Sequence, residues 1–448
     1  MDEKLATAMK CILSRKRFGS RPGLFRIEYI LKELRNPQDE INIVHIAGTN
    51  GKGSTAAYLT ELFINTGLTV GTYTSPAIER FNERICINGC HIPNEDIIYL
   101  VERLEPIVTE MDKNPVLSGL TEFEYVTAMM YGYFQAKKVD VAIIETGLGG
   151  LMDSTNVGHP IVSGITTIGL DHMQILGNSI EKIAQQKAGI IKENSLIVTG
   201  NIPENAMRVI EVKASSLGAQ IYRYNQEYFP RHIVTKPLEG ECFSFNNDIY
   251  YFPFLTISLL GKHQVENAGM ALQMYLLFME YLELTVNWQV IEESFSHAFI
   301  PGRMELLSKQ PLVIIDGAHN VPGIERLQAN LEEMLAKRSK SSTCYILFSA
   351  INTKDVSGMI GLLENIDQAQ LTITSFDYES ALSVGEIAVN CQQQVNISNN
   401  WHDAVTALLN LMNDDDFLII TGSLYFISTI RHQLQDMLAK MNQLLTVN

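Results

Sequence analysis

The sequence has 448 residues and a formal net charge of −16 at pH 7. This length predicts two domains, or two domains and a large insertion, rather than a single core. Hydrophobic residues make up 46% and charged residues 19%, as is typical of a globular protein. The acidic surface argues against nucleic acid and anionic membranes as partners.

The cysteines and the N-terminal residues indicate in which cellular compartment the protein is expected. The six cysteines are too sparse for a disulfide framework, which favours a reducing, cytoplasmic setting. Residues 1–16 are amphipathic and charged and do not resemble a secretory signal. No apolar run reaches the ~18 residues that a membrane-spanning helix needs.

The first half of the chain alternates predicted strands and helices. The elements in chain order are a strand at 41–47, a helix at 54–65, a strand at 69–74, a helix at 122–134, strands at 141–144 and 161–168, a helix at 180–188 and a strand at 196–199. The first three form a βαβ unit. Continuous apolar strands that alternate with helices predict a mostly parallel sheet covered on both faces.

The pattern changes near residue 220. Aromatic-rich runs such as 249–252 predict a few flanking β-strands before a helix at 264–281. A second α/β set follows, with strands at 312–315, 345–348, 371–374 and 417–420 and helices near 322–337, 355–364, 401–412 and 424–443. We therefore expect an α/β fold, with a P-loop domain of mostly parallel sheet at residues 1–298 and a smaller Rossmann-like α/β domain at 299–448. Pro301-Gly302 punctuates the boundary.

A glycine-rich loop joins the first strand to the helix after it. Its residues are Gly48, Thr49, Asn50, Gly51, Lys52, Gly53 and Ser54. Glycines allow successive N–H groups to surround an anion, and the helix N-terminus adds further N–H groups. Lys52 is placed to reach the β- and γ-phosphates, with Ser54 and Thr49 near the phosphates or a metal. Gly53 departs from the usual spacing. The loop predicts nucleotide binding, and the alternative is a purely structural turn.

Polar residues follow two further strands. Glu145 ends an apolar strand, and Asp171-His172 follows the next one. Because the carboxyl ends of parallel strands meet at one sheet edge, these side chains are expected beside the loop. A carboxylate there suits Mg²⁺. Taken alone, His172 reads as a capping or core histidine, and Lys187 as a solvated helix residue.

The heptad GTNGKGS at 48–54 resembles the phosphate loop of folylpolyglutamate synthases and dihydrofolate synthases, a branch of the Mur ligase superfamily. The other segments that resemble this family, in the family's order, are TSPAIERFNERICING (74–89), ETGLGGLMDSTNV (145–157), GLDHMQILGNSIEKIAQQKAGIIK (169–192), GKHQVENAGMAL (261–272), PGRMELL (301–307), IDGAHN (315–320) and TGSLYF (421–426). This likeness covers most of the chain and is more specific than any single motif.

The resemblance implies roles for individual residues in the first domain. Ser75, Glu145 and His172 would supply magnesium ligands, with Ser54 beside them and two Mg²⁺ sites expected. Lys187 corresponds to a lysine that is carbamylated in the family. A carbamate would replace a repelling ammonium with an oxygen ligand or an anchor behind the ligands.

The resemblance also assigns contacts for the nucleotide and for the substrates. Arg303 would reach the ATP phosphates from the opposite wall, and Asp316 and His319 would contact the nucleotide or the incoming amino acid. Asn267 matches a residue that contacts adenine. Ser75, Arg84, His319 and Ser423 are expected to bind substrate. The alternatives are a surface arginine for Arg303 and a plain helix N-cap for Asp316.

By this resemblance the chain would be an ATP-dependent ligase that adds L-glutamate to the glutamate carboxylate of tetrahydrofolate through an acyl phosphate. ATP and Mg²⁺ would be its cofactors, with a K⁺ requirement left open, and it would act as a cytoplasmic monomer. The resemblance also allows an additional dihydrofolate synthase activity. Ala77 stands where the family often has histidine, which removes one polar contact for folate, and Leu151 stands where the family often has arginine, which weakens the expectation of dihydropteroate handling.

Three alternatives remain open at this point. The first is a dihydrofolate synthase alone. The second is a Mur ligase of cell-wall synthesis, although the loop at residue 48 leaves no room for a preceding UDP-binding domain. The third is a regulatory P-loop ATPase, which would have no need of a second α/β domain.

Overall fold

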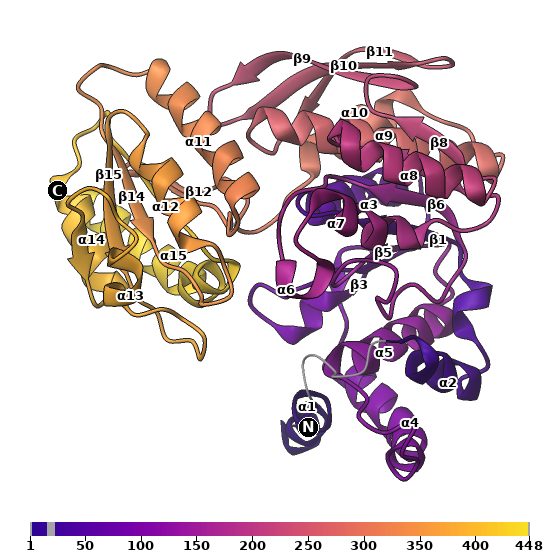
Figure 1. The fold of residues 1–448 in the computed structure, drawn as a ribbon. Coiled ribbons are helices and arrows are strands. Elements are labelled where there is room, and N and C mark those ends of the chain that lie inside the picture. Colours follow the sequence, from indigo (N-terminus) through magenta and orange to yellow (C-terminus); the bar gives the residue numbers. More distant parts are fainter. Residues whose placement is uncertain (1, 16–22, 447–448) are drawn as a thin grey trace.

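A computed structural model of the protein describes residues 2–15 and 23–446 (Figure 1). In this part of the chain, an eight-stranded sheet of order β4-β3-β2-β5-β1-β6-β7-β8 forms the centre of the first domain. Its strands are β1 Ile43–Ala47, β2 Val70–Tyr73, β3 Ile85–Ile87, β4 Cys90–His91, β5 Val141–Glu145, β6 Pro160–Ile165, β7 Leu196–Thr199 and β8 Gln220–Arg223. In sheet order, the neighbouring strands β2, β5, β1, β6, β7 and β8 all run parallel, which confirms the predicted sheet. The antiparallel β3–β4 edge was not predicted.

Helices cover both faces of this sheet. They are α1 Asp2–Leu13, α2 Phe25–Glu33, α3 Lys52–Asn65, α4 Asn94–Asp112, α5 Glu122–Lys137, α6 Met173–Leu176, α7 Ile180–Lys187, α8 Glu204–Ser216, α9 Lys262–Tyr281 and α10 Trp288–His297. One apolar core lies between the sheet and α3, α9 and α10, and a second involves α1, α2, α4 and α5. A third core involves α7 and α8. The two-sided covering explains why the central strands β1 and β5 are buried along their whole length.

An antiparallel three-stranded sheet flanks the first domain, at the top of Figure 1. Its strands are β9 Tyr228–Lys236, β10 Gly240–Asn247 and β11 Tyr251–Ile257. It packs against α9 through buried aromatic side chains such as Phe243 and Phe245. These strands confirm the prediction made from the aromatic-rich runs.

The second domain has a six-stranded sheet in the described residues, of order β12-β13-β17-β14-β15-β16. Its strands are β12 Glu305–Lys309, β13 Leu312–Ile315, β14 Cys344–Phe348, β15 Ala369–Thr374, β16 Asn396–Ser398 and β17 Phe417–Thr421. The four predicted strands are confirmed. β12 and β16 are edge strands that were missed, because β12 carries charged residues at both of its ends and β16 has only three residues, two of them polar.

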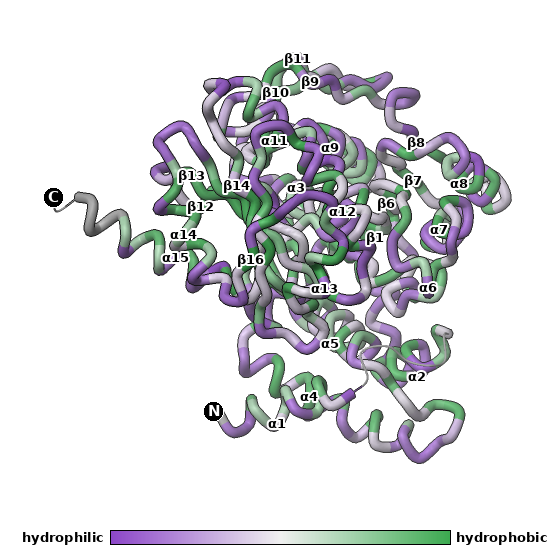
Figure 2. The backbone as a smooth tube through the Cα atoms, turned by 60° about the vertical axis from the view of Figure 1, so that its left-hand side comes forward, coloured by the Kyte–Doolittle hydropathy of each residue, from purple (hydrophilic) through white to green (hydrophobic). Residues whose placement is uncertain are grey.

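Two helical layers enclose this second sheet. The helices are α11 Val321–Ala336, α12 Val356–Glu364, α13 Val384–Ala388, α14 Trp401–Leu411 and α15 Leu424–Thr446. α11, α12 and α13 cover one face, and α14 and α15 cover the other. Figure 2 shows the hydrophobic residues concentrated in the central strands, with hydrophilic residues in the outer loops. Among the described residues, no helix is both long and apolar enough to cross a membrane.

Candidate active site between the two domains

The phosphate loop leaves the end of β1 and leads into α3. Gly51 stands at the N-cap of α3 with a φ of 89°, in the left-handed region that favours glycine. The Asn50 backbone N–H donates to the Thr167 hydroxyl at 3.0 Å, and the Thr166 hydroxyl donates to the Asn50 carbonyl at 2.6 Å. The neighbouring strand β6 therefore leads into residues that hold the loop in shape before any ligand binds.

Two lysine ammonium groups meet one carbonyl of this loop. Lys187 Nζ lies 2.7 Å from the Gly48 carbonyl oxygen, and Lys52 Nζ lies 3.2 Å from the same oxygen. Burial, assisted by the charge of Lys52, lowers the pKa of Lys187 to about 7. Lys187 is therefore an amine that loses its proton near neutral pH, and not the solvated helix residue suggested by its sequence alone.

Glu145 faces the loop from the end of β5. Its Oε1 atom lies 3.6 Å from Lys52 Nζ. Burial raises the pKa of the Glu145 carboxyl, while Lys52 and the Ser75 backbone N–H oppose that rise. His172, from the loop after β6, lines the same cavity, and burial lowers its pKa. The predicted meeting of these side chains at one sheet edge is therefore observed.

The second domain supplies the opposite wall of the cavity. Arg303 and His319 line it together with the whole phosphate loop, Ser75, Glu145, His172 and Lys187. The His319 Nδ1 atom lies 2.8 Å from the Gly317 carbonyl oxygen, and burial lowers the pKa of His319 to about 3. His319 is therefore neutral at neutral pH, so Arg303 is the cation that the second domain contributes to the cavity lining.

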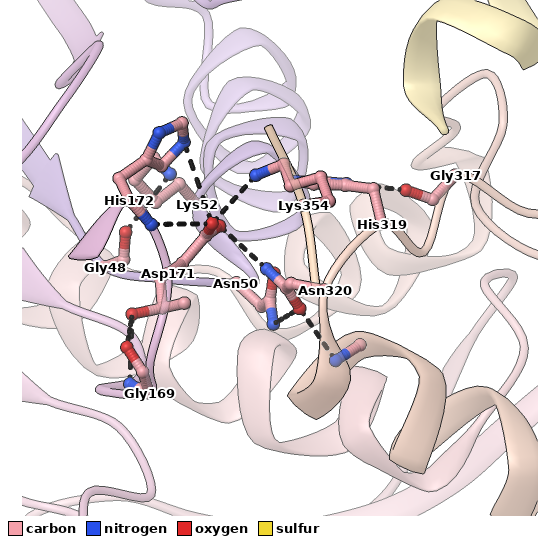
Figure 3. A network of polar contacts seen from close by, with 12 residues as sticks. Gly48, Asn50, Lys52, Gly169, Asp171, His172, Gly317, His319, Asn320 and Lys354 are labelled. Atoms are coloured by element: carbon pink, nitrogen blue, oxygen red, sulfur yellow. Dashed lines mark hydrogen bonds and ion pairs between the residues drawn. The ribbon is translucent and has the colours of Figure 1, made fainter. Parts of the chain in front are cut away.

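A polar network joins the two domains beside the phosphate loop (Figure 3). The side-chain amides of Asn50 and Asn320 pair reciprocally, at 3.0 and 3.2 Å. Asn320 Nδ2 also donates to Asp171 Oδ2 at 2.9 Å, and Lys354 Nζ lies 2.8 Å from Asp171 Oδ1. Burial raises the pKa of Asp171, but Lys354 and the other donors outweigh it and hold that pKa well below its usual range.

Asn320 did not appear among the predicted site residues. The available signal was its place directly before an expected helix, where its Oδ1 accepts the Gly323 N–H at 2.8 Å. A sequence shows such a cap, but the pairing with Asn50 spans 270 residues. Asp171 was expected at this sheet edge together with His172, but its ion pair with Lys354 of the second domain was not predicted.

Four predicted residues lie outside the cavity lining. Arg84 is buried among the rings of Phe81 and Phe123, with Nη1 2.9 Å from Glu122 Oε1. It therefore organises the loop after β2. Asn267 on α9 packs against Gly51, where an added Cβ would lie 2.4 Å from its Oδ1.

The other two, Asp316 and Ser423, contact nearby backbone. Asp316 accepts the N–H groups of Met304 and Ala318 at 2.8 and 2.9 Å. Ser423 is buried and accepts the Tyr425 N–H at 3.2 Å at the start of α15. Their predicted contacts with nucleotide or substrate stay predictions.

The predicted magnesium ligands are consistent with a site completed by substrate. In the described residues, no three His, Cys, Asp or Glu side chains form a ready metal cluster. The cavity instead offers the Glu145 carboxylate, the Ser54 and Ser75 hydroxyls and His172. Mg²⁺ commonly binds through one or two carboxylates together with substrate phosphates and water, so this donor set fits that ion.

Comparison with known proteins identifies the family. Residues 46–275 match the Mur ligase middle domain, and residues 302–424 match the Mur ligase glutamate ligase domain. The dihydrofolate synthase/folylpolyglutamate synthase of Bacillus subtilis is 38% identical over 445 residues, covering 96% of this chain and 98% of that protein. The chain belongs to the folylpolyglutamate synthase family of the Mur ligase superfamily.

Solved structures of folylpolyglutamate synthases share this architecture. The Mycobacterium tuberculosis enzyme complexed with ADP is 28% identical, has a TM-score of 0.86, and the match covers 96% of this chain and 98% of that one. A folylpolyglutamate synthase (FPGS) in complex with AMPPCP and folate is 32% identical, with a TM-score of 0.84, and the match covers 96% of this chain and 99% of that one. The predicted family and fold class are confirmed.

Proposed function

We propose that this chain uses ATP to join L-glutamate to the terminal glutamate carboxylate of a reduced folate. One observation carries the proposal: the phosphate loop, Glu145 and Arg303 face one cavity between two domains in a folylpolyglutamate synthase family member. The relatives' complexes with ADP and with AMPPCP and folate support these substrates. On the same grounds we propose a boundary between residues 298 and 299, with each domain supplying one wall.

The chemistry requires activation because a carboxylate is a poor electrophile. Transfer of the ATP γ-phosphoryl group to the folate carboxylate gives an acyl phosphate and ADP. The glutamate amine then attacks the acyl carbon, and phosphate leaves. Lys52 and Arg303, on opposite walls of the cavity, would offset the charge on the transferring phosphoryl group.

The two-domain enclosure has a second role. An acyl phosphate exposed to water would hydrolyse before the amine arrived, so the closed cavity must exclude water. The contacts of Asn320 and Lys354 with Asn50 and Asp171 hold the second domain against the phosphate loop. We infer that these contacts maintain the enclosure during the reaction.

Glu145, Ser54, Ser75 and His172 would hold Mg²⁺ together with the nucleotide phosphates. The ion, when bound, would supply positive charge to the phosphate oxygens. A second Mg²⁺ and a K⁺ remain part of the proposal on family grounds. Assays without Mg²⁺ and assays without K⁺ test whether each kind of ion is required.

Lys187 is proposed to carry a carbamate. Its pKa of about 7 supplies the neutral amine that reacts with CO₂. Its Nζ atom lies 2.7 Å from the Gly48 carbonyl oxygen, and both residues line the cavity. A mass increase of one CO₂ on gently handled wild-type protein, absent from Lys187→Ala, supports the modification. Full activity of Lys187→Ala would contradict it.

The function is tested by ADP release in three reactions. They contain ATP and glutamate with tetrahydrofolate, with dihydropteroate, or with neither. Release that requires tetrahydrofolate, with a product heavier by one glutamyl residue, is the expected result. Release with dihydropteroate alone would indicate a dihydrofolate synthase, and release independent of both would favour a regulatory ATPase.

We also propose that the enzyme is a cytoplasmic monomer. All six cysteines are free, consistent with a reducing compartment. The proposed reaction needs only small molecules, and both walls of the cavity come from one chain. Light scattering across a range of concentrations tests the oligomeric state.

A further inference from the structure

Arg431 on α15 bridges the two domains away from the phosphate loop. Its Nε atom lies 2.9 Å from Glu305 Oε2, and its Nη2 atom lies 2.6 Å from Glu305 Oε1. Its Nη1 atom donates to Glu79, which belongs to the first domain. The side chains of Arg431 and Glu305 are 14% and 5% exposed. A planar guanidinium is suited to holding two carboxylates at once.

One limb of this bridge reaches the turn that carries Arg303. Glu305 Oε2 accepts the Gly302 backbone N–H at 2.7 Å, and the Gly302 carbonyl accepts the Gly317 N–H at 2.7 Å. Arg303 is the next residue and lines the cavity. Arg431 therefore holds, through Glu305, the backbone from which Arg303 extends.

The other limb reaches the loop between β2 and β3. The Glu83 carboxylate accepts the backbone N–H groups of Ile78, Glu79 and Arg80, at 2.8, 3.1 and 2.7 Å. These hydrogen bonds hold residues 78–80, the tip of the loop, in one conformation. Arg431 holds the same unit from outside through the Glu79 side chain.

α15 makes a second contact with this tip. The Ser428 hydroxyl donates to the Ile78 carbonyl, one helical turn before Arg431. Ser75, near the start of this loop, lines the cavity, and its backbone N–H interacts with Glu145. α15 therefore contacts the loop that forms part of the cavity wall in the first domain.

We propose that Arg431 is a positioning residue that sets both walls of the active-site cavity at once. Through Glu305 it places Arg303, and through Glu79 it places the Ser75 loop. Closure of the domains and alignment of the two walls are then one event. The kinetic consequence rests on the proposed ligase function, whereas the positioning itself does not.

Two substitutions distinguish the effect of the Arg431–Glu79 contact from that of the Arg431–Glu305 contact. Glu79→Gln removes the negative charge from the contact between Arg431 and Glu79, and it leaves the Arg431–Glu305 contact and the Ser428–Ile78 hydrogen bond in place. Arg431→Lys keeps a positive charge beside Glu305 but loses the planar fork, so both limbs weaken. Glu204→Gln on α8 is the matched control, since it removes an exposed ion pair with Arg208 far from the bridge in sequence.

The first readout is amide hydrogen exchange by mass spectrometry, with melting temperature as the check on folding. We expect Glu79→Gln to speed exchange in residues 75–84 alone. Arg431→Lys is expected to speed exchange in both 75–84 and 300–306. Unchanged exchange at 300–306 in Arg431→Lys, or at 75–84 in Glu79→Gln, overturns the proposal.

The second readout is steady-state kinetics. Loss of one charge-assisted contact predicts a fall of roughly tenfold in kcat/KM for Glu79→Gln, and Arg431→Lys, in which both contacts weaken, is expected to lose at least as much, with the melting temperature unchanged in both variants. The Glu79→Gln change is expected mainly in the KM for folate, whereas Arg431→Lys also lowers kcat. Wild-type kinetics in both variants, or losses that only follow the melting temperature, would refute the role. If the wild-type protein shows no folate-dependent ADP release, the proposed function fails, and hydrogen exchange still decides the role of Arg431.

Discussion

Replacing Lys187 with methionine is expected to change how stability depends on pH. Burial, assisted by Lys52, lowers the pKa of Lys187 from 10.5 to about 7 in the folded protein. Between these values the unfolded chain binds a proton that the folded chain does not. The free energy of unfolding therefore rises with pH by about 1.4 kcal/mol per pH unit in this window.

The size of the effect follows from the same two values. Below pH 7 the ammonium is charged in both states, and the full cost of burying it is present. Lowering the pKa from 10.5 to about 7 corresponds to about 5 kcal/mol. Lys187→Met removes this cost, and the Gly48 carbonyl keeps Lys52 at 3.2 Å. We expect the variant to be more stable than wild type at pH 7, with an advantage that shrinks as pH rises.

Urea unfolding at pH 7, 8 and 9 in CO₂-free buffer measures this advantage. The advantage should fall by about 1 kcal/mol from pH 7 to pH 8, because the folded amine is half protonated at pH 7, and by about 1.4 kcal/mol from pH 8 to pH 9. Lys113→Met, which alters a lysine whose side chain is 68% exposed, controls for the loss of one positive charge. A difference between Lys187→Met and wild type that stays constant across this range would refute the reasoning.

Three further substitutions test the site. Lys52→Ala should lower kcat by roughly 10²-fold or more, as expected for one lost charge-stabilising group, and near-normal turnover in the ADP assay would contradict that role. Gly51→Ala forces a φ of 89° on a residue with a Cβ and places that atom 2.4 Å from Asn267 Oδ1. Calorimetry should show weaker binding of AMPPCP. An unchanged affinity would argue that the conformation of the loop at Gly51 does not determine nucleotide binding. Lys354→Met leaves the mostly buried Asp171 without its cation, at a cost of about 3 kcal/mol in domain docking. Small-angle scattering should then report a larger radius of gyration, and an unchanged radius would show that this pair does not hold the domains.

Much of the fold was predictable because its signals are local. The apolar run at 43–47, the glycines of the loop and the helical spacing after Lys52 specify a strand, a turn and a helix from neighbouring residues. The same reasoning placed Glu145 and His172 at one sheet edge. Edge strands such as β16 were missed because their few polar residues carry little periodic signal.

The sequence by itself therefore determined the phosphate loop, the order of the central parallel strands, and the residues at the ends of these strands. Only the tertiary structure decided how the domains meet. Asn50 and Asn320 are 270 residues apart, and Glu79 and Arg431 are 352 apart, so no spacing in the chain encodes their pairing. The burial that lowers the pKa of Lys187 likewise depends on tertiary structure, because it brings α7 against the Gly48 carbonyl, 139 residues away in the chain.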